Sequence, residues 1–62
     1  MLVKLKGKRV EKGLTQADIS KMLGMATATY NLKENGKVEF SMNECISIMK
    51  ILECSFEDIF LQ

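Results

Sequence analysis

Three helix-start signals fall within 62 residues, and they constrain the fold of this chain more than any other feature. In each signal a hydroxyl side chain stands three residues before a carboxylate: Thr15 before Asp18, Ser41 before Glu44, and Ser55 before Asp58. In this arrangement, the capping box, the hydroxyl accepts from an early backbone N–H and the carboxylate reaches back to the helix start. The chain is therefore expected to be mainly helical.

Helix ends are marked as clearly as helix starts. Gly13, Gly24 and the pair Asn35-Gly36 each follow a run with helical apolar spacing, and a left-handed helix end is expected at Asn35-Gly36. Strand-like alternation is scarce, and there is no proline. The pattern predicts an all-α bundle of five helices, over residues 2–12, 16–23, 27–34, 42–53 and 56–61. We expect a single domain, 1–62, and a complete small protein from Met1 to Gln62.

The residue types present argue against enzyme and metal-site chemistry. The chain has no histidine and two cysteines, Cys45 and Cys54, so it can form neither a four-ligand zinc site nor a Cys–His nucleophile pair. It has no phosphate-cradling glycine loop and no evident small-molecule site. We expect no enzymatic activity, metal or cofactor. No apolar run approaches the ~18 residues that a membrane span requires, so we expect a soluble, cytoplasmic protein.

Charge is distributed unevenly along the chain. Residues 1–37 carry eight basic and three acidic side chains, whereas residues 38–62 carry one basic and five acidic. This separation predicts a basic face for a polyanion and an acidic face turned away from it. An ordinary solvated mixture of charges is the alternative.

The segment 15–37 predicts two helices joined by a short turn at Gly24-Met25. Such a pair forms a helix-turn-helix, whose second helix can enter the major groove of DNA. Gly24 suits the turn because a positive φ is costly for a residue with a Cβ atom. Ile19, Leu23 and Tyr30 would hold the two helices together. By pattern alone, any αα-hairpin would fit equally well.

Three runs together resemble the helix-turn-helix domain of the phage Cro and repressor family, the XRE family. They are KGKRVEKGLTQADISKMLG, TYNLKENGK and EFSMNECISIMKILECSFEDIF, and the resemblance covers residues 4–61. It implies a five-helix, lambda-repressor-like DNA-binding domain with its helix-turn-helix at the second and third helices. It further implies an operator-binding homodimer that controls transcription.

The resemblance assigns the base-facing positions to the helix 27–34. They are Thr27, Ala28, Asn31 and Leu32, which share one helical face while Tyr30 points to the core. Thr27 and Asn31 can form hydrogen bonds, Asn31 ideally to both polar atoms of an adenine edge, and Ala28 and Leu32 can contact thymine methyl groups. Related proteins have Ser or Thr at position 26 and a polar or basic residue at position 32. With Ala26, Leu32 and no arginine on this helix, we expect a preference for A·T pairs facing Ala28 and Leu32.

The resemblance assigns a second set of residues to phosphate contacts and positioning. Gln16 is expected to contact phosphate and brace the recognition helix, and Asn35, Lys37 and the backbone N–H groups that follow are expected to clamp phosphate. Thr15 and Lys8 complete this set. Arg9 and Glu34 are expected to form a buried structural ion pair. The alternative for the lysines is simple solvation.

Two functions follow from this interpretation. The first is a Cro-like transcriptional repressor of phage or prophage origin, dimerising through apolar side chains of the acidic C-terminal part: Ile48, Ile51, Phe60 and Leu61. The second is a helical protein-interaction module of antitoxin or antirepressor type that keeps the fold without strong DNA readout.

Overall fold

The computed structural model describes residues 1–61 and contains five helices in that range. They are α1 (Val3–Glu11), α2 (Gln16–Leu23), α3 (Thr27–Glu34), α4 (Met42–Leu52) and α5 (Phe56–Ile59). The prediction of an all-α, five-helix fold is confirmed, and α2 and α3 have the predicted bounds. The last helix is shorter than predicted because Phe60 already closes it as its C-cap. Gln62, where the protein was expected to end, lies outside the described residues.

Each of the three predicted capping boxes has its carboxylate half in place, at the starts of α2, α4 and α5. The backbone N–H of Thr15 donates to Asp18 at 2.9 Å, that of Ser41 to Glu44 at 2.8 Å, and that of Ser55 to Asp58 at 3.0 Å. These bonds satisfy amides that would otherwise lack a partner at the helix start, and the negative charge suits the positive end of the helix dipole. Short helices in so small a chain depend on such local terms.

The helix ends differ in conformation. Gly24 ends α2 in the left-handed region with φ of 72°. Asn35, in contrast, is right-handed, and the positive φ falls on Gly36 at 80°, so the left-handed residue lies one position later than Asn35. Glu53 ends α4 at φ of 54°, a conformation that glycine adopts at much lower cost.

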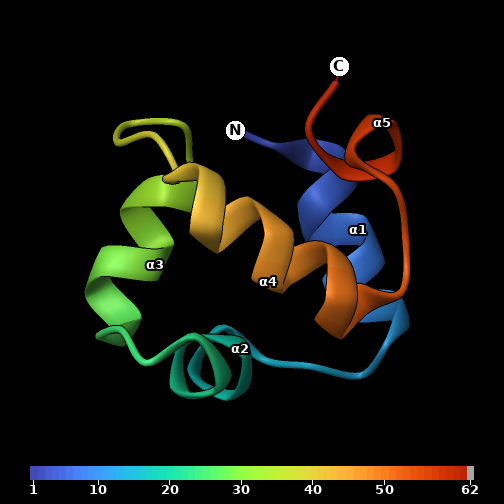
Figure 1. The fold of residues 1–62 in the computed structure, drawn as a ribbon. Helices are drawn as coiled ribbons and strands as arrows, with labels where there is room; N and C mark the ends of the chain where they lie inside the picture. Colours follow the sequence, from blue (N-terminus) through green and yellow to red (C-terminus); the bar gives the residue numbers. More distant parts are fainter. Residues whose placement is uncertain (62) are drawn as a thin grey trace.

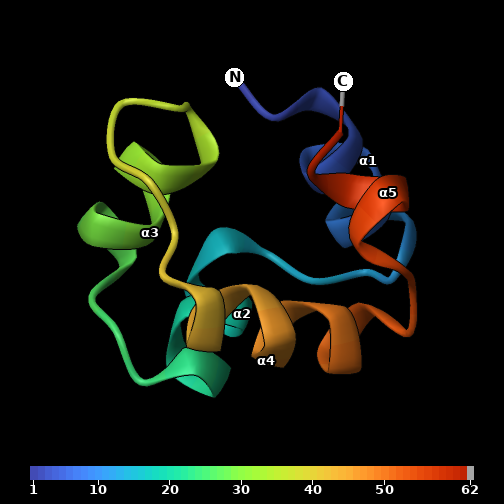
Figure 2. The ribbon, with the colours of Figure 1, turned by 45° about the horizontal axis from the view of Figure 1, so that its top comes forward.

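The helices enclose one core. α1 and α5 lie side by side, α2 and α3 pack as a pair, and α4 crosses the middle of the molecule between them (Figures 1 and 2). The N-terminus lies at the same end of the fold as α5. None of the helices in residues 1–61 has the length and apolarity needed to cross a bilayer.

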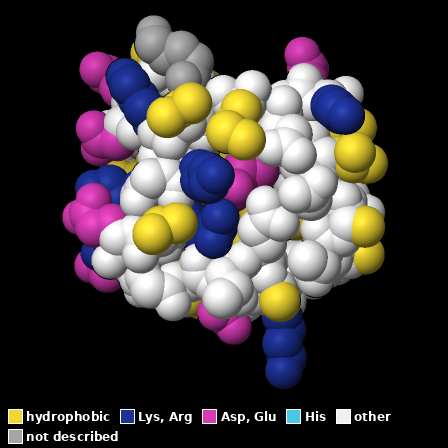
Figure 3. Space-filling view, turned by 180° about the vertical axis from the view of Figure 1, so that it is seen from behind, with side chains coloured by type: hydrophobic (Ala, Val, Ile, Leu, Met, Phe, Trp, Pro, Cys, Tyr) yellow, Lys and Arg dark blue, Asp and Glu magenta, His cyan; other side chains and the backbone are white. Residues whose placement is uncertain are grey.

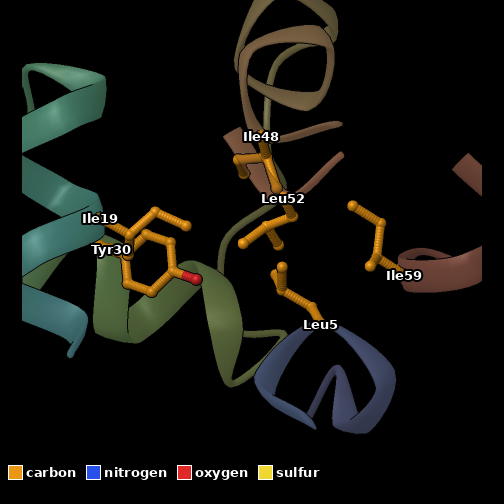
Figure 4. Packing of buried hydrophobic residues seen from close by; sticks show 6 residues of the cluster. All are labelled: Leu5, Ile19, Tyr30, Ile48, Leu52 and Ile59. Carbon is orange, nitrogen blue, oxygen red and sulfur yellow. The ribbon is translucent and has the colours of Figure 1, made fainter. Parts of the chain in front are cut away.

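Six fully buried side chains from all five helices point toward one another in this core (Figure 4). They are Leu5, Ile19, Tyr30, Ile48, Leu52 and Ile59. Ile48 was expected at a dimer contact, and that expectation is wrong because its side chain is completely buried within the chain. Phe40, in the loop before α4, packs against Tyr30 and Phe60 with ring centroids 5.8 Å from each. The core thus fixes α3 from its inner side and leaves its outer side exposed.

Candidate nucleic-acid interface

The turn between α2 and α3 sets the angle at which α3 is presented. Met25 donates its backbone N–H to the carbonyl of Ser20 at 3.0 Å, and Gly24 donates to the carbonyl of Lys21 at 3.1 Å. Met25 packs on the edge of the core. Ala26 begins α3 without a side-chain cap, as its methyl group requires.

A pair of hydroxyl groups connects the two helices where that cap is missing. The hydroxyl of Ser20, which is buried, donates to the carbonyl of Ala17 at 3.0 Å, and its oxygen lies 3.1 Å from the hydroxyl oxygen of Thr27. Since Ser20 has a single hydroxyl proton, Thr27 must be the donor between the two. The lone pairs of the Thr27 hydroxyl oxygen are then left to accept a hydrogen bond from a ligand. Sequence reasoning did not single out Ser20, because a serine inside a helix carries no signal of its partner.

The outer face of α3 is small and largely uncharged. Thr27 and Ala28 are exposed, and Leu32 is 42% exposed although it is apolar. An exposed leucine that contributes nothing to the core is suited to contact another apolar group, such as a thymine methyl. Asn31 is only half-buried and lies between this face and α2.

Beneath that face lies a cluster that we call the Glu34 junction, formed by Arg9, Gln16, Tyr30, Asn31 and Glu34. The guanidinium of Arg9 donates twice to the carboxylate of Glu34, at 2.9 and 3.2 Å, and once to the carbonyl of Leu14 at 2.6 Å. Tyr30 donates its hydroxyl proton to Glu34 at 2.6 Å. The ion pair therefore ties α1 to the end of α3 and to the core.

The charge of Glu34 is stabilised despite its burial. Burial acts to raise its pKa, but hydrogen bonds from Arg9, Tyr30 and Gln16 prevail and hold the pKa below the ordinary value. The Glu34 hydrogen bond raises the pKa of Arg9, against its desolvation. Burial and then Glu34 raise the pKa of the Tyr30 hydroxyl. At neutral pH the junction holds a carboxylate, a guanidinium and a phenol.

Three carboxamides extend the junction toward the surface. Gln16 donates to Glu34 at 3.2 Å, Asn31 donates to the carbonyl oxygen of Gln16 at 3.1 Å, and Asn35 donates to that of Asn31 at 3.2 Å. Gln16 is thereby held against α3. Asn31 uses one N–H group and one lone pair of its oxygen within the chain, so its bonds to Gln16 and Asn35 restrict how its carboxamide can turn toward a base edge.

The loop after α3 differs from the expected phosphate clamp. The backbone N–H groups of Gly36, Lys37 and Val38 all donate to carbonyls of α3, at 3.0, 2.9 and 3.4 Å. These amides are committed to closing the helix, and the loop offers the exposed side chain of Lys37 instead. Thr15 likewise has its backbone N–H occupied by Asp18, which leaves its hydroxyl proton for a ligand.

A family model described as "Helix-turn-helix" matches residues 5–59. The chain belongs to the XRE-type helix-turn-helix family. The match includes α2, the Gly24 turn and α3, which ends at Glu34, together with Arg9 in α1. This helix-turn-helix family is one of DNA-binding regulators. No curated protein matches the chain.

Within this helix-turn-helix domain, Lys8 lies apart from the other predicted phosphate contacts. Its Nζ atom is 3.7 Å from Glu11, and its charge adds to hydrogen bonds from Ser55 in lowering the pKa of Asp58 at the start of α5. Lys8 therefore faces α5, about 100° around the helix from its neighbour Arg9 in the Glu34 junction.

The expected division into a basic and an acidic face is not what the fold produces. Lys12 lies 3.8 Å from Glu53, and Lys33 lies 2.6 Å from Glu44, so basic groups of the first half pair with acidic groups of the second. Charged side chains of both signs gather over α1 and α5, at the left of Figure 3, while the α3 side of that view is mostly uncharged. The helix-turn-helix face thus has few formal charges.

Proposed function

We propose that this chain is a sequence-specific transcriptional regulator, a Cro-like repressor of phage or prophage type that binds double-stranded operator DNA. The observation that carries the proposal is α3, which is fixed by the core on one side and exposes Thr27, Ala28 and Leu32 on the other. Such a helix can lie in the major groove with its small side chains against base edges. Repression would follow from occupying an operator.

Phosphate contacts are proposed for Gln16, Thr15, Asn35 and Lys37, which border α3. Their side chains provide N–H, O–H or ammonium donors, and such contacts position a protein on the duplex without specifying its sequence. Each lysine that neutralises a phosphate makes log K fall with log salt by about 0.9 per contact. With Lys37 as the main cation of this border, the salt dependence should be shallow.

The operator complex is proposed to be a homodimer, with the two α3 helices about 34 Å apart in successive major grooves. The C-terminal part offers the contacts: Leu61 is 51% exposed, Phe56 is 40% exposed, and Ile51 and Phe60 are partly buried. Analytical ultracentrifugation of the chain alone and with a palindromic duplex tests this stoichiometry. Binding of one protomer per duplex would contradict it.

Selection of binding sites from random DNA duplexes tests the proposed function most directly. We expect a consensus with A·T pairs facing Ala28 and Leu32, because neither side chain can form a hydrogen bond to guanine. Gln16→Ala combined with Lys37→Ala should weaken binding to the selected site, while Asn43→Ala combined with Lys50→Ala, on α4, should not. Equal affinity for both double variants would contradict the site.

The second candidate is a protein-interaction module that keeps the fold without strong DNA readout. The observation that favours it is the scarcity of formal charge around α3, given that Lys12 and Lys33 are paired with acidic residues. Fluorescence anisotropy with a labelled duplex at low salt, about 50 mM, separates the two functions, because non-specific DNA binding is strongest there. Absence of any binding under that condition would favour the interaction module.

A further inference from the structure

The direction of each carboxamide next to the Glu34 junction is dictated from within the protein. Glu34 is 1% exposed and its carboxylate, being ionised, can only accept hydrogen bonds. A carboxamide that contacts it must therefore turn its NH₂ group inward. Gln16 lies at 3.2 Å from the carboxylate, so its nitrogen faces Glu34 and its oxygen faces outward along the surface.

The same constraint passes to the next two residues. Because the oxygen of Gln16 points to Asn31, Asn31 must present its NH₂ group there, at 3.1 Å. The oxygen of Asn31 is consequently directed to the NH₂ group of Asn35, at 3.2 Å. A reversal at any one position would place two donors or two acceptors against each other. The ion pair with Arg9 keeps Glu34 charged and so maintains the direction of the whole series.

We propose that Glu34 is a positioning residue that fixes the carboxamides of Gln16 and Asn31, and that the N–H group left to each of them donates to a backbone phosphate oxygen. The proposal rests on the function proposed above and identifies the chemistry that this part of the site accepts. Asn31 then does not read adenine, although its residue type and position on α3 favour that contact.

Counting protons and lone pairs supports this assignment. Among the described residues, Gln16 and Asn31 each use one N–H in the series, so one N–H of each is left for a ligand. The oxygen of each accepts one hydrogen bond and keeps its second lone pair. Phosphate oxygens are pure acceptors, and they match the free N–H group of each carboxamide. Base discrimination is left to Thr27, Ala28 and Leu32.

The free protein provides the first test, by NMR of the side-chain NH₂ groups. Asn31→Ala removes the donor to the Gln16 oxygen and should shift the Gln16 NH₂ resonances, while the proton bonded to Glu34 stays protected from exchange; Asn43→Ala, a carboxamide deletion on α4, should leave Gln16 unchanged. Glu34→Gln should alter the NH₂ signals of both Gln16 and Asn31, although Asn31 does not touch Glu34. Gln16 signals that ignore Asn31→Ala would overturn the proposal. If Glu34→Gln does not fold, the Asn31→Ala comparison decides.

DNA binding provides the second test. In random-site selection, Asn31→Ala should return the wild-type consensus and bind it about threefold to tenfold more weakly, as expected for one lost hydrogen bond. Leu32→Ala, the control on the same helix, should change the consensus. Loss of an adenine at one half-site position in Asn31→Ala alone would overturn the proposal. If wild-type protein binds no duplex, the proposed function and the phosphate ligands fail together, while the NMR test still decides the carboxamide directions.

Discussion

The Glu34 junction and the charged side of α1 use the same kinds of residue to different ends. In the junction, Arg9 and Glu34 are almost completely removed from water, and each donor and acceptor is matched at 2.6–3.2 Å. Elsewhere on α1 and at its C-cap, Lys8 and Lys12 meet Glu11 and Glu53 at 3.7 and 3.8 Å, with both carboxylates well exposed. A buried pair can hold its neighbours in one arrangement, whereas an exposed pair exchanges freely with water.

This contrast indicates which interactions fix the position of α3 in so small a domain. Among residues 1–61, only six side chains form the fully buried apolar cluster, so the core alone gives limited control over α3. The buried polar network adds direction, because hydrogen bonds require specific partners while apolar packing does not. The lysine-rich side of α1 adds solubility and little positional information.

Removing the central carboxylate should have the largest effect on stability. Glu34→Ala leaves Arg9 buried without a counter-charge and should lower the free energy of unfolding by about 3–5 kcal/mol. Its counterpart Glu11→Ala, across α1, should change it by less than about 1 kcal/mol because that pair is exposed. Urea denaturation followed by circular dichroism measures both. Similar losses for the two variants would contradict the comparison.

Lowering the pH should reduce the stability that Glu34 contributes to the folded protein. The pKa of Glu34 is held below its usual 4.5, because hydrogen bonds from Arg9, Tyr30 and Gln16 outweigh the effect of burial. Below pH 4.5 the unfolded chain therefore binds the proton first. Stability that is fully present above pH 4.5 is lost as the pH falls through the folded pKa.

Urea denaturation from pH 7 down to pH 3 measures this effect. Glu34→Gln, which has no proton to gain, should show a flatter dependence than the wild type, because only Asp18, Glu44 and Asp58 then contribute lowered pKa values. Parallel pH profiles for the two proteins would show that Glu34 does not titrate as described.

A smaller loss in the free energy of unfolding is expected from a change at Tyr30. Tyr30→Phe keeps the ring in the core but removes the hydroxyl that donates to Glu34 at 2.6 Å, which should cost about 1.5–3 kcal/mol, as for a hydrogen bond to a charged group. Tyr30→Phe should also shift the NMR signals of Gln16, which shares Glu34 with Tyr30, and Phe40→Leu, which alters the ring packing and no hydrogen bond, is the control for that shift. An unfolding free energy unchanged by Tyr30→Phe would show that the hydroxyl adds nothing to the junction.

The helices could be predicted from sequence, and the hydrogen bonds between them could not. Capping residues and glycines act within one turn, so the bounds of α2 and α3 follow from local pattern. Gln16 and Glu34 are 18 residues apart, and only the packed fold brings their atoms to 3.2 Å. For the same reason the resemblance, together with residue type, assigned Asn31 to adenine and Lys8 to phosphate, while the fold surrounds one with carboxamides and turns the other to α5.

The smallest expected effect on stability is at the end of α4, where a substitution should raise the free energy of unfolding. Glu53 adopts φ of 54°, a left-handed conformation that costs a residue with a Cβ atom about 1–2 kcal/mol, against about 0.5–1 kcal/mol of extra entropy that glycine loses on folding. Glu53→Gly should therefore raise the free energy of unfolding by about 0.5–1 kcal/mol. Glu53→Ala is the matched control, since it removes the same contact with Lys12 but keeps the Cβ atom. Thermal denaturation of both variants separates backbone strain from the ion pair: a gain for glycine alone identifies strain, whereas equal stability of the two variants would show that the left-handed residue carries no net cost here.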